Sequence, residues 1–213
     1  LVIESEERGV SVRATAAEGI RVGDRVLVSG FIEARQPIAF FTNAVVKKIA
    51  DGEVPPAVTP SVDEILMASH DNTGRSWGLP PKDFNYRLVR IKGTLMGHVA
   101  AGTEAFSIQA ESGEQVAVRF ASGAGGFSQA PLAGSVVEVT GVATVLHGPG
   151  DPLPEFRRPV GVELLLREAG DLQVLSAPSW WTLRRPSPTR SARSSWARTS
   201  RAASTSSRPM PKT

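Results

Sequence analysis

Three basic side chains form the most interesting candidate cluster in this sequence. Arg90 and Lys92 lie in one strand-like run and Arg119 lies in another, at positions where the alternation of apolar and polar residues points the side chain outward. We expect the two runs to form adjacent strands, so that the three cations share one face and are candidates to bind a small ligand or a protein partner. The alternative is an ordinary solvated sheet face.

The other polar residues show no pattern typical of an active site. His70, His98 and His147 are isolated, whereas a metal site needs three or four converging ligands, usually with a close pair in the sequence. No serine lies in Gly-x-Ser-x-Gly, and the glycine-rich stretches lack the lysine of a phosphate-binding loop. Glu111 and Glu114 flank a turn, where acids usually aid solubility. We therefore expect no catalytic residue, no metal and no cofactor.

The charge of the chain is unevenly distributed. The formal net charge of +3 and the pI of about 9.7 suggest a partner such as nucleic acid. However, residues 182–213 contain eight cations and no acid, and without them the first 181 residues carry −5. Because the folded part is acidic, we consider nucleic acid an unlikely partner. The chain contains no cysteine, which excludes disulfides and thiolate chemistry.

The elements that would position the three cations belong to a repeat. Residues 134–141, Gly-Ser-Val-Val-Glu-Val-Thr-Gly, closely match residues 23–30, Gly-Asp-Arg-Val-Leu-Val-Ser-Gly. The preceding segments, 106–119 and 1–13, share an alternating pattern with a turn between two strands. We interpret the protein as the same small β-module twice, with the first copy lacking its opening strand. We also expect a fragment, because the sequence starts without Met and already inside a strand pattern.

The second copy predicts a barrel of the OB type. The widest gap between its strands comes after the third, as in an OB-type Greek key, and Gly93 and Gly141 lie mid-strand where barrel strands bend. An antiparallel sandwich is the alternative. The five strand-like runs lie near residues 87–99, 103–111, 114–120, 135–146 and 159–175. The side chains expected to point inward are Val89, Ile91, Leu95, Phe106, Ile108, Val116, Val118, Val137 and Val139.

A short helix is predicted between the two modules. Ser61 is suited to the N-cap and Glu64 to the third helical position, and the apolar residues 65–67 follow, with an end near Ser69. The predicted fold is thus mainly β, with tandem OB-like five-stranded barrels, the first incomplete, a linking helix and a disordered C-terminal tail. The predicted domains are an incomplete module at 1–54, a linker at 55–86, a full module at 87–177 and a tail at 178–213.

The segment after the second module has a different character. Trp180 and Trp181 are followed by Arg184 and Arg185, a pattern typical of a membrane-proximal anchor, although the tryptophans could instead cap the open end of the barrel. No apolar run of membrane-spanning length follows. The chain continues in Ser, Arg, Ala, Thr and Pro to Thr213, a composition that predicts disorder.

These residues resemble a known class of bacterial receptor. Pro-Ser-Trp-Trp-Thr at 178–182, together with Gly-Asp-Arg-Val at 23–26 and Ser-Val-Asp-Glu-Ile-Leu at 61–66, is similar to the extracytoplasmic sensor region of two-component sensor histidine kinases and GGDEF-type membrane receptors. In that class the Trp-Trp motif immediately precedes a transmembrane helix. This sequence departs from the pattern after Arg185, and we interpret the tail as a frame-shifted or truncated reading of that helix.

The resemblance implies a non-catalytic sensory or scaffold region on the periplasmic side of the inner membrane. A histidine kinase or diguanylate cyclase domain would then belong to the full-length parent, as would contact with the membrane. A homodimer is compatible with such a receptor. The alternative function is an OB-fold nucleic-acid-binding protein with a basic tail; however, the outward positions of the three strands carry no aromatic residue for base stacking. A weak carbohydrate or peptide binder is a third reading of the same face.

Overall fold

The computed structural model describes residues 1–5, 8–35, 38–70, 83–97, 105–121, 127, 131–148 and 159–178. Within these ranges the chain is mainly β, with one short α-helix and one 3-10 turn. In chain order the elements are β1 (Val2–Ser5), β2 (Arg8–Ala16), β3 (Arg25–Arg35), β4 (Ile38–Ala50), α1 (Val62–His70), β5 (Leu88–Met96), β6 (Ala105–Ala110), β7 (Gln115–Phe120), β8 (Val136–His147), β9 (Pro159–Leu166), η2 (Ala169–Asp171) and β10 (Leu172–Ser176).

Strands β5 to β9 form a closed five-stranded barrel. β5 pairs antiparallel with both β6 and β8, β6 pairs with β7, and β8 pairs with β9. The ring is completed by a parallel pair, β7 with β9. This order confirms the OB-like Greek key and excludes the sandwich. The barrel has no room for a side chain at Gly93, because a Cβ there would lie 2.5 Å from the carbonyl oxygen of Gln109 on β6.

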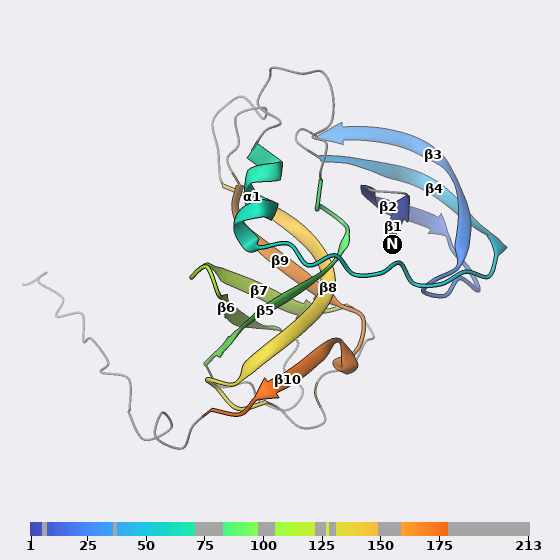
Figure 1. The fold of residues 1–213 in the computed structure, drawn as a ribbon. Helices are drawn as coiled ribbons and strands as arrows, with labels where there is room; N and C mark the ends of the chain where they lie inside the picture. Colours follow the sequence, from blue (N-terminus) through green and yellow to red (C-terminus); the bar gives the residue numbers. More distant parts are fainter. Residues whose placement is uncertain are drawn as a thin grey trace, which may run out of the picture.

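Strands β1 to β4 form a curled half-barrel with the same pairing pattern less one strand. β1 pairs antiparallel with β2, β2 pairs parallel with β4, and β4 pairs antiparallel with β3. These contacts repeat β6–β7, β7–β9 and β8–β9 of the barrel, so the prediction of a duplicated module without its opening strand is confirmed. Figure 1 shows β3 and β4 curling past β1 and β2, beside the barrel.

The side chains that the alternation predicted to point inward form the core of the barrel. Eight of the nine side chains predicted to point inward are buried, and Phe106 is partly buried and packs against them. Phe127 completes this region, with its ring centroid 4.9 Å from that of Phe120 and 5.5 Å from that of Phe106. Among the described residues, the barrel core contains eighteen buried residues, whereas the half-barrel core contains three, Val12, Ala44 and Val46.

Helix α1 begins with the predicted capping box and covers one end of the barrel (Figure 1). The Ser61 hydroxyl accepts a hydrogen bond from the Glu64 amide at 3.2 Å, and Glu64 Oε2 accepts one from the Ser61 amide at 2.8 Å. The helix, which the sequence places in the linker, buries Val62 and Ile65 in the barrel core. Just before it, Val58 forms an isolated parallel bridge with Val89 at the start of β5.

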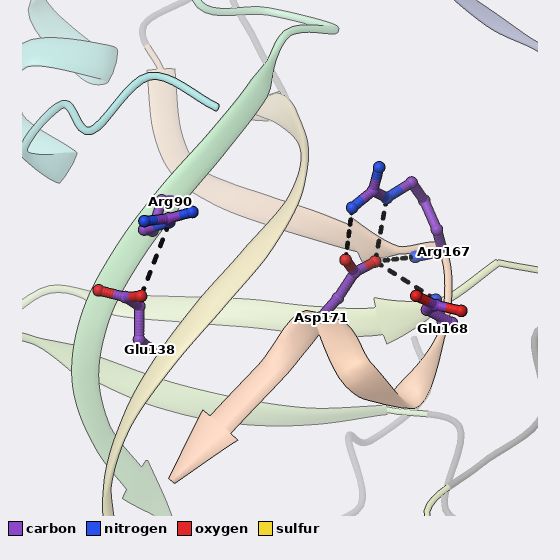
Figure 2. A network of polar contacts seen from close by, with 5 residues as sticks. All are labelled: Arg90, Glu138, Arg167, Glu168 and Asp171. Atoms are coloured by element: carbon purple, nitrogen blue, oxygen red, sulfur yellow. Dashed lines mark hydrogen bonds and ion pairs between the residues drawn. The ribbon is translucent and has the colours of Figure 1, made fainter. Parts of the chain in front are cut away.

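The last strand-like run does not form one strand, contrary to the prediction for 159–175. β9 ends at Leu166, the chain turns through η2, and β10 then pairs antiparallel with the beginning of β8. The turn is held by Asp171, which is 6% exposed. Its carboxylate accepts hydrogen bonds from the Arg167 amide at 2.8 Å and from Arg167 Nε at 3.1 Å (Figure 2). This ion pair raises the pKa of Arg167 further above its already high ordinary value.

Candidate ligand-binding face and inter-module joint

The three predicted ligand-binding cations all lie on the outer surface of the barrel, but they are not on adjacent strands. Arg90 and Lys92 are on β5 and Arg119 is on β7, and β6 lies between these strands. All three side chains are exposed, as the alternation predicted. The prediction of adjacency was wrong because strand order cannot be deduced from alternation alone.

Each of the three cations has an acidic partner on a neighbouring strand or turn. Arg90 Nε lies 3.6 Å from Glu138 Oε1, a pair visible in Figure 2. Lys92 Nζ lies 2.8 Å from Glu111 Oε1, and this hydrogen bond raises the pKa of Lys92. Their positive charge is therefore largely balanced within the sheet.

Arg119 forms the most complete of these pairs. Its Nε lies 2.8 Å from Glu163 Oε1 and its Nη2 donates a hydrogen bond to Glu163 Oε2 at 3.0 Å, which gives a two-pronged contact across the parallel β7–β9 pair. An anion that bound here would have to displace a carboxylate from the guanidinium group. The three cations do not form an open phosphate-binding cluster.

A shallow hollow of about 410 Å³ lies beside Lys92 on the outer face of β5 and β6. None of the described residues that line it is aromatic, and the lining combines amide, hydroxyl and charged groups with small apolar ones. The lining residues are Lys92, Gly93, Thr94, Gln109, Ala110, Glu111, Gly113 and Val136. Such a surface suits polar or peptide groups better than stacked bases.

The rest of this outer face is occupied with its own hydrogen bonds. Gln115 Nε2 donates to Ser107 Oγ at 2.9 Å, and Gln109 Nε2 donates to the carbonyl oxygen of Gly113 at 3.2 Å. Ser112 donates to Glu114 at the tip of the β6–β7 hairpin. The polar side chains of this hairpin therefore already have hydrogen-bond partners within β6, β7 and the turn between them.

The acidic partners were not predicted as site residues. Glu138 lies on β8 and Glu163 on β9, each at an outward position of its strand. The sequence did contain a signal for these partners: the outward positions of β8 and β9 carry acids, whereas those of β5 and β7 carry the cations. Using it would have required the register between β5 and β8 and between β7 and β9, which alternation does not supply.

Residues 83–87 form a second structured region, of which residues 83–86 were predicted to belong to the linker. Asn85 Oδ1 accepts a hydrogen bond from the Val145 amide at 3.0 Å, and the Tyr86 amide donates to the carbonyl oxygen of Ala143 at 2.7 Å. Both contacts are with β8. The segment is therefore attached to the barrel immediately before β5 begins.

The same segment also contacts the half-barrel. Arg87 Nε lies 3.1 Å from Glu4 Oε1 on β1, and the two side chains are only 14% and 12% exposed. At the start of β2, a Cβ on Gly9 would lie 2.0 Å from the carbonyl oxygen of Tyr86. Tyr86 itself has a φ of 61°, a conformation that side-chain-bearing residues rarely adopt. We call residues 83–87, with Glu4 and Gly9, the inter-module joint.

Burial changes the titration of two groups in this joint. It raises the pKa of Asp83, although the hydrogen bond from the Asn85 amide and the positive charges of Arg8 and Arg87 act in the opposite direction. Burial also raises the pKa of Tyr86, whose side chain forms a hydrogen bond with Ser11 on β2. The joint is thus a partly desolvated contact rather than a chain crossing through solvent.

Several predicted residues lie outside the part of the chain that the structure describes. These include the membrane-proximal set Trp180, Trp181, Arg184 and Arg185, as well as His98 and the tail beyond Pro178. Among the described residues, no three His, Asp or Glu side chains are grouped so that they could hold a metal ion. No helix in the same part of the chain has both the length and the apolar character to span a membrane.

Comparison with known proteins found no match to any family model, to any curated protein or to any solved structure.

Proposed function

We propose that this chain is the non-catalytic sensory or scaffold region of a bacterial signal-transduction receptor, in which the two β-modules move as one unit. The supporting observation is the inter-module joint: Tyr86 is bound to β8 by its amide, and its carbonyl oxygen occupies the space where a side chain on Gly9 would lie. A joint of this kind passes a displacement of one module directly to the other.

The extracytoplasmic setting is part of the same proposal and comes from the Pro-Ser-Trp-Trp-Thr resemblance at 178–182. In this proposal the membrane helix, the kinase or cyclase output domain and the periplasmic location belong to the full-length receptor. Its partner would be a small ligand or a protein that binds one of the modules, and a homodimer is part of the same proposal.

The nucleic-acid alternative has less support from the barrel surface. Arg90, Lys92 and Arg119 are each paired with a carboxylate, so that binding a phosphate backbone would first require breaking ion pairs. A version of the chain that ends at Pro178, without the basic tail, tests this point by fluorescence anisotropy with a single-stranded oligonucleotide. Salt-sensitive binding by that version would favour the alternative.

The unit proposal is tested by measuring the distance between the modules. The chain has no cysteine, so spin labels can be attached cleanly at Leu27→Cys on β3 and Met96→Cys on β5, which are 60% and 42% exposed. We expect one narrow distance distribution in the parent protein and a broad one in Gly9→Ala. A broad distribution in the parent protein would contradict the proposal.

Gly161→Ala provides the matched control for this experiment. Gly161 lies in β9, and the nearest atom to an added Cβ is the end of the Leu146 side chain at 3.9 Å, an ordinary contact. This variant changes the same residue type in the same way without affecting the joint. It should keep the narrow distribution, so that broadening in Gly9→Ala can be assigned to the contact with Tyr86.

A further inference from the structure

Two strand edges of the half-barrel, one on β1 and one on β3, have no partner strand among the described residues. β1 pairs only with β2, and β3 pairs only with β4. In the barrel the equivalent strands, β6 and β8, are both paired with β5, which lies between them and runs antiparallel to each. The half-barrel therefore has a gap of one strand at the place that β5 fills in the barrel. We call this gap the open slot.

The repeat identifies the residues that line the open slot. Val26 and Val28 of β3 correspond to Val137 and Val139 of β8, because residues 23–30 match residues 134–141. Ile3 of β1 corresponds in the same way to Ile108 of β6. The slot thus has the same kind of aliphatic lining as the barrel interior.

The exposure of these residues shows the effect of the missing strand. In the barrel, Ile108, Val137 and Val139 are each 0% exposed. Their counterparts Ile3, Val26 and Val28 are only partly buried and pack at the margin of a core of three residues. Covering them would remove apolar surface from water, which favours occupation of the slot.

We propose that the open slot accepts an opening β-strand, supplied by polypeptide that leads directly into β1 on the amino-terminal side of Leu1. The strand runs antiparallel to both β1 and β3, with alternate apolar side chains facing Ile3 and Val28. A small residue lies near its middle, as Gly93 does in β5. We infer the strand from the two unpaired edges and from the repeat.

The connection to β1 decides where the strand comes from. In the barrel, β5 ends at Met96 and β6 begins at Ala105, so only a short connection joins them. By the same pattern, the strand that fills the open slot should come just before β1 in the chain. Leu1 already continues the ladder with β2, since its nitrogen donates to the carbonyl oxygen of Val12 at 3.0 Å. A strand joined through so short a loop loses little entropy on closure, whereas a strand from another molecule also loses translational and rotational freedom.

An unfilled slot would be a hazard for a free protein. Leu27, Phe31 and Ile32 on the edge strand β3 are 60%, 73% and 70% exposed. Unpaired edges with exposed apolar residues promote pairing with other chains, and natural sheets usually cover them. An opening strand removes this hazard by pairing both edges at once.

The test adds a strand to the amino terminus of residues 1–213. The extension carries the sequence of β5, Leu-Val-Arg-Ile-Lys-Gly-Thr-Leu-Met, followed by about eight Gly and Ser residues that join it to Leu1, a length chosen from the connection between β5 and β6. The control extension has the same composition, with its apolar and polar positions exchanged so that apolar side chains would face outward. Hydrogen exchange is then measured by mass spectrometry for β1, β3 and the barrel strands.

The amides of β1 and β3 should exchange at least about tenfold more slowly with the first extension than with the control, while barrel amides stay unchanged. Equal exchange in the two proteins would overturn the proposal. So would a dimer of the unextended chain with β1 and β3 already protected, because the occupant would then be a second copy.

A disulfide provides a second measurement that does not depend on stability. Lys92 pairs with Glu138 in the barrel, and Glu138 corresponds to Leu27 of β3. A cysteine at the Lys92-equivalent position of the extension should therefore cross-link with Leu27→Cys. It should not cross-link with Val28→Cys, whose side chain points to the other face. Cross-linking to both cysteines at the same rate, or to neither, would also overturn the proposal.

Discussion

The closed barrel and the half-barrel differ by one strand, although their remaining strands pair in the same order. In the part of the chain that the structure describes, the barrel core has eighteen buried residues and the half-barrel core has three. Much of this difference arises because β5 contributes inward side chains of its own and also covers those of β6 and β8, while α1 adds Val62 and Ile65. We infer that the strand that closes the ring of a small β-module has a large effect on how fully its core is buried. The following predictions test this inference.

The largest effect is expected from a matched pair of core substitutions. Ile108→Ala in the barrel should lower the free energy of unfolding by about 2–5 kcal/mol, because Ile108 is fully buried and its loss leaves a cavity. Ile3→Ala, at the equivalent position of the half-barrel, should cost clearly less because Ile3 is only partly buried beside the open slot. Urea unfolding followed by circular dichroism measures both values. Equal losses would mean that the half-barrel interior is as well covered as the barrel.

The next effect concerns the turn that attaches β10 to the barrel, for which the described half-barrel has no counterpart. Asp171→Asn weakens the charge-assisted hydrogen bonds from Arg167 and should cost about 1.5–3 kcal/mol. Amides of β10 should lose protection from hydrogen exchange more than those of β6. Glu18→Gln, at an exposed position of the half-barrel, serves as the control and should change neither quantity. Unchanged β10 protection in Asp171→Asn would show that the ion pair does not hold the turn.

A smaller effect is expected from acid, and it concerns an ion pair of the half-barrel. Lys48 Nζ lies 2.6 Å from Asp24 Oδ1, and this contact, together with the Arg21 amide, lowers the pKa of Asp24 below its ordinary value of 3.8. A lowered pKa in the folded state adds stability above pH 3.8 that is lost as the pH falls through the folded pKa.

Unfolding midpoints measured between pH 7 and pH 2 test whether the stability contributed by Asp24 is lost on acidification. The difference between the parent protein and Asp24→Asn should be largest near neutral pH and should shrink as the pH falls below about 4. Asp51→Asn is the control. Asp51 also contacts Lys48 at 2.6 Å but is 95% exposed, so its substitution should change the unfolding midpoint less than Asp24→Asn does. A difference that grows on acidification would contradict the role given to Asp24.

The smallest effect is expected on the outer face of the barrel. Arg119→Gln removes an exposed ion pair with Glu163 and should cost about 0.2–1 kcal/mol. The loss should diminish in 1 M salt, where charges at a surface are screened to within about 3 Å. Chemical denaturation by urea at low and high salt measures it. A large, salt-independent loss would show that the pair supports the barrel core rather than its surface.

Much of the fold could be predicted from the sequence because its signals are local. Alternation with a period of two predicted which side chains of β5 to β8 point inward, and the spacing of Ser61 and Glu64 predicted the start of α1. The match between residues 23–30 and 134–141 predicted the duplication, since the same strand occurs in both modules.

The features that could not be predicted depend on register or on contacts distant in sequence. The ion pairs of Arg90 and Arg119 follow from the alignment of β5 with β8 and of β7 with β9, which closure of the barrel determines. Residues 83–87 have no periodicity, so nothing indicated that they contact both modules. The turn at Asp171 interrupts a run of suitable residues, and only the pairing of β10 with β8 explains why the chain turns there.

The contact between Gly9 and Tyr86 also constrains how this protein can evolve. Any side chain larger than hydrogen at position 9 collides with main-chain atoms of the other module, which no single replacement at position 86 can remove. The two halves share one repeated strand pattern, but this contact means that one cannot simply be exchanged for the other. A lineage that exchanged its first module for another would have to keep a glycine at this point or rebuild the segment that meets it.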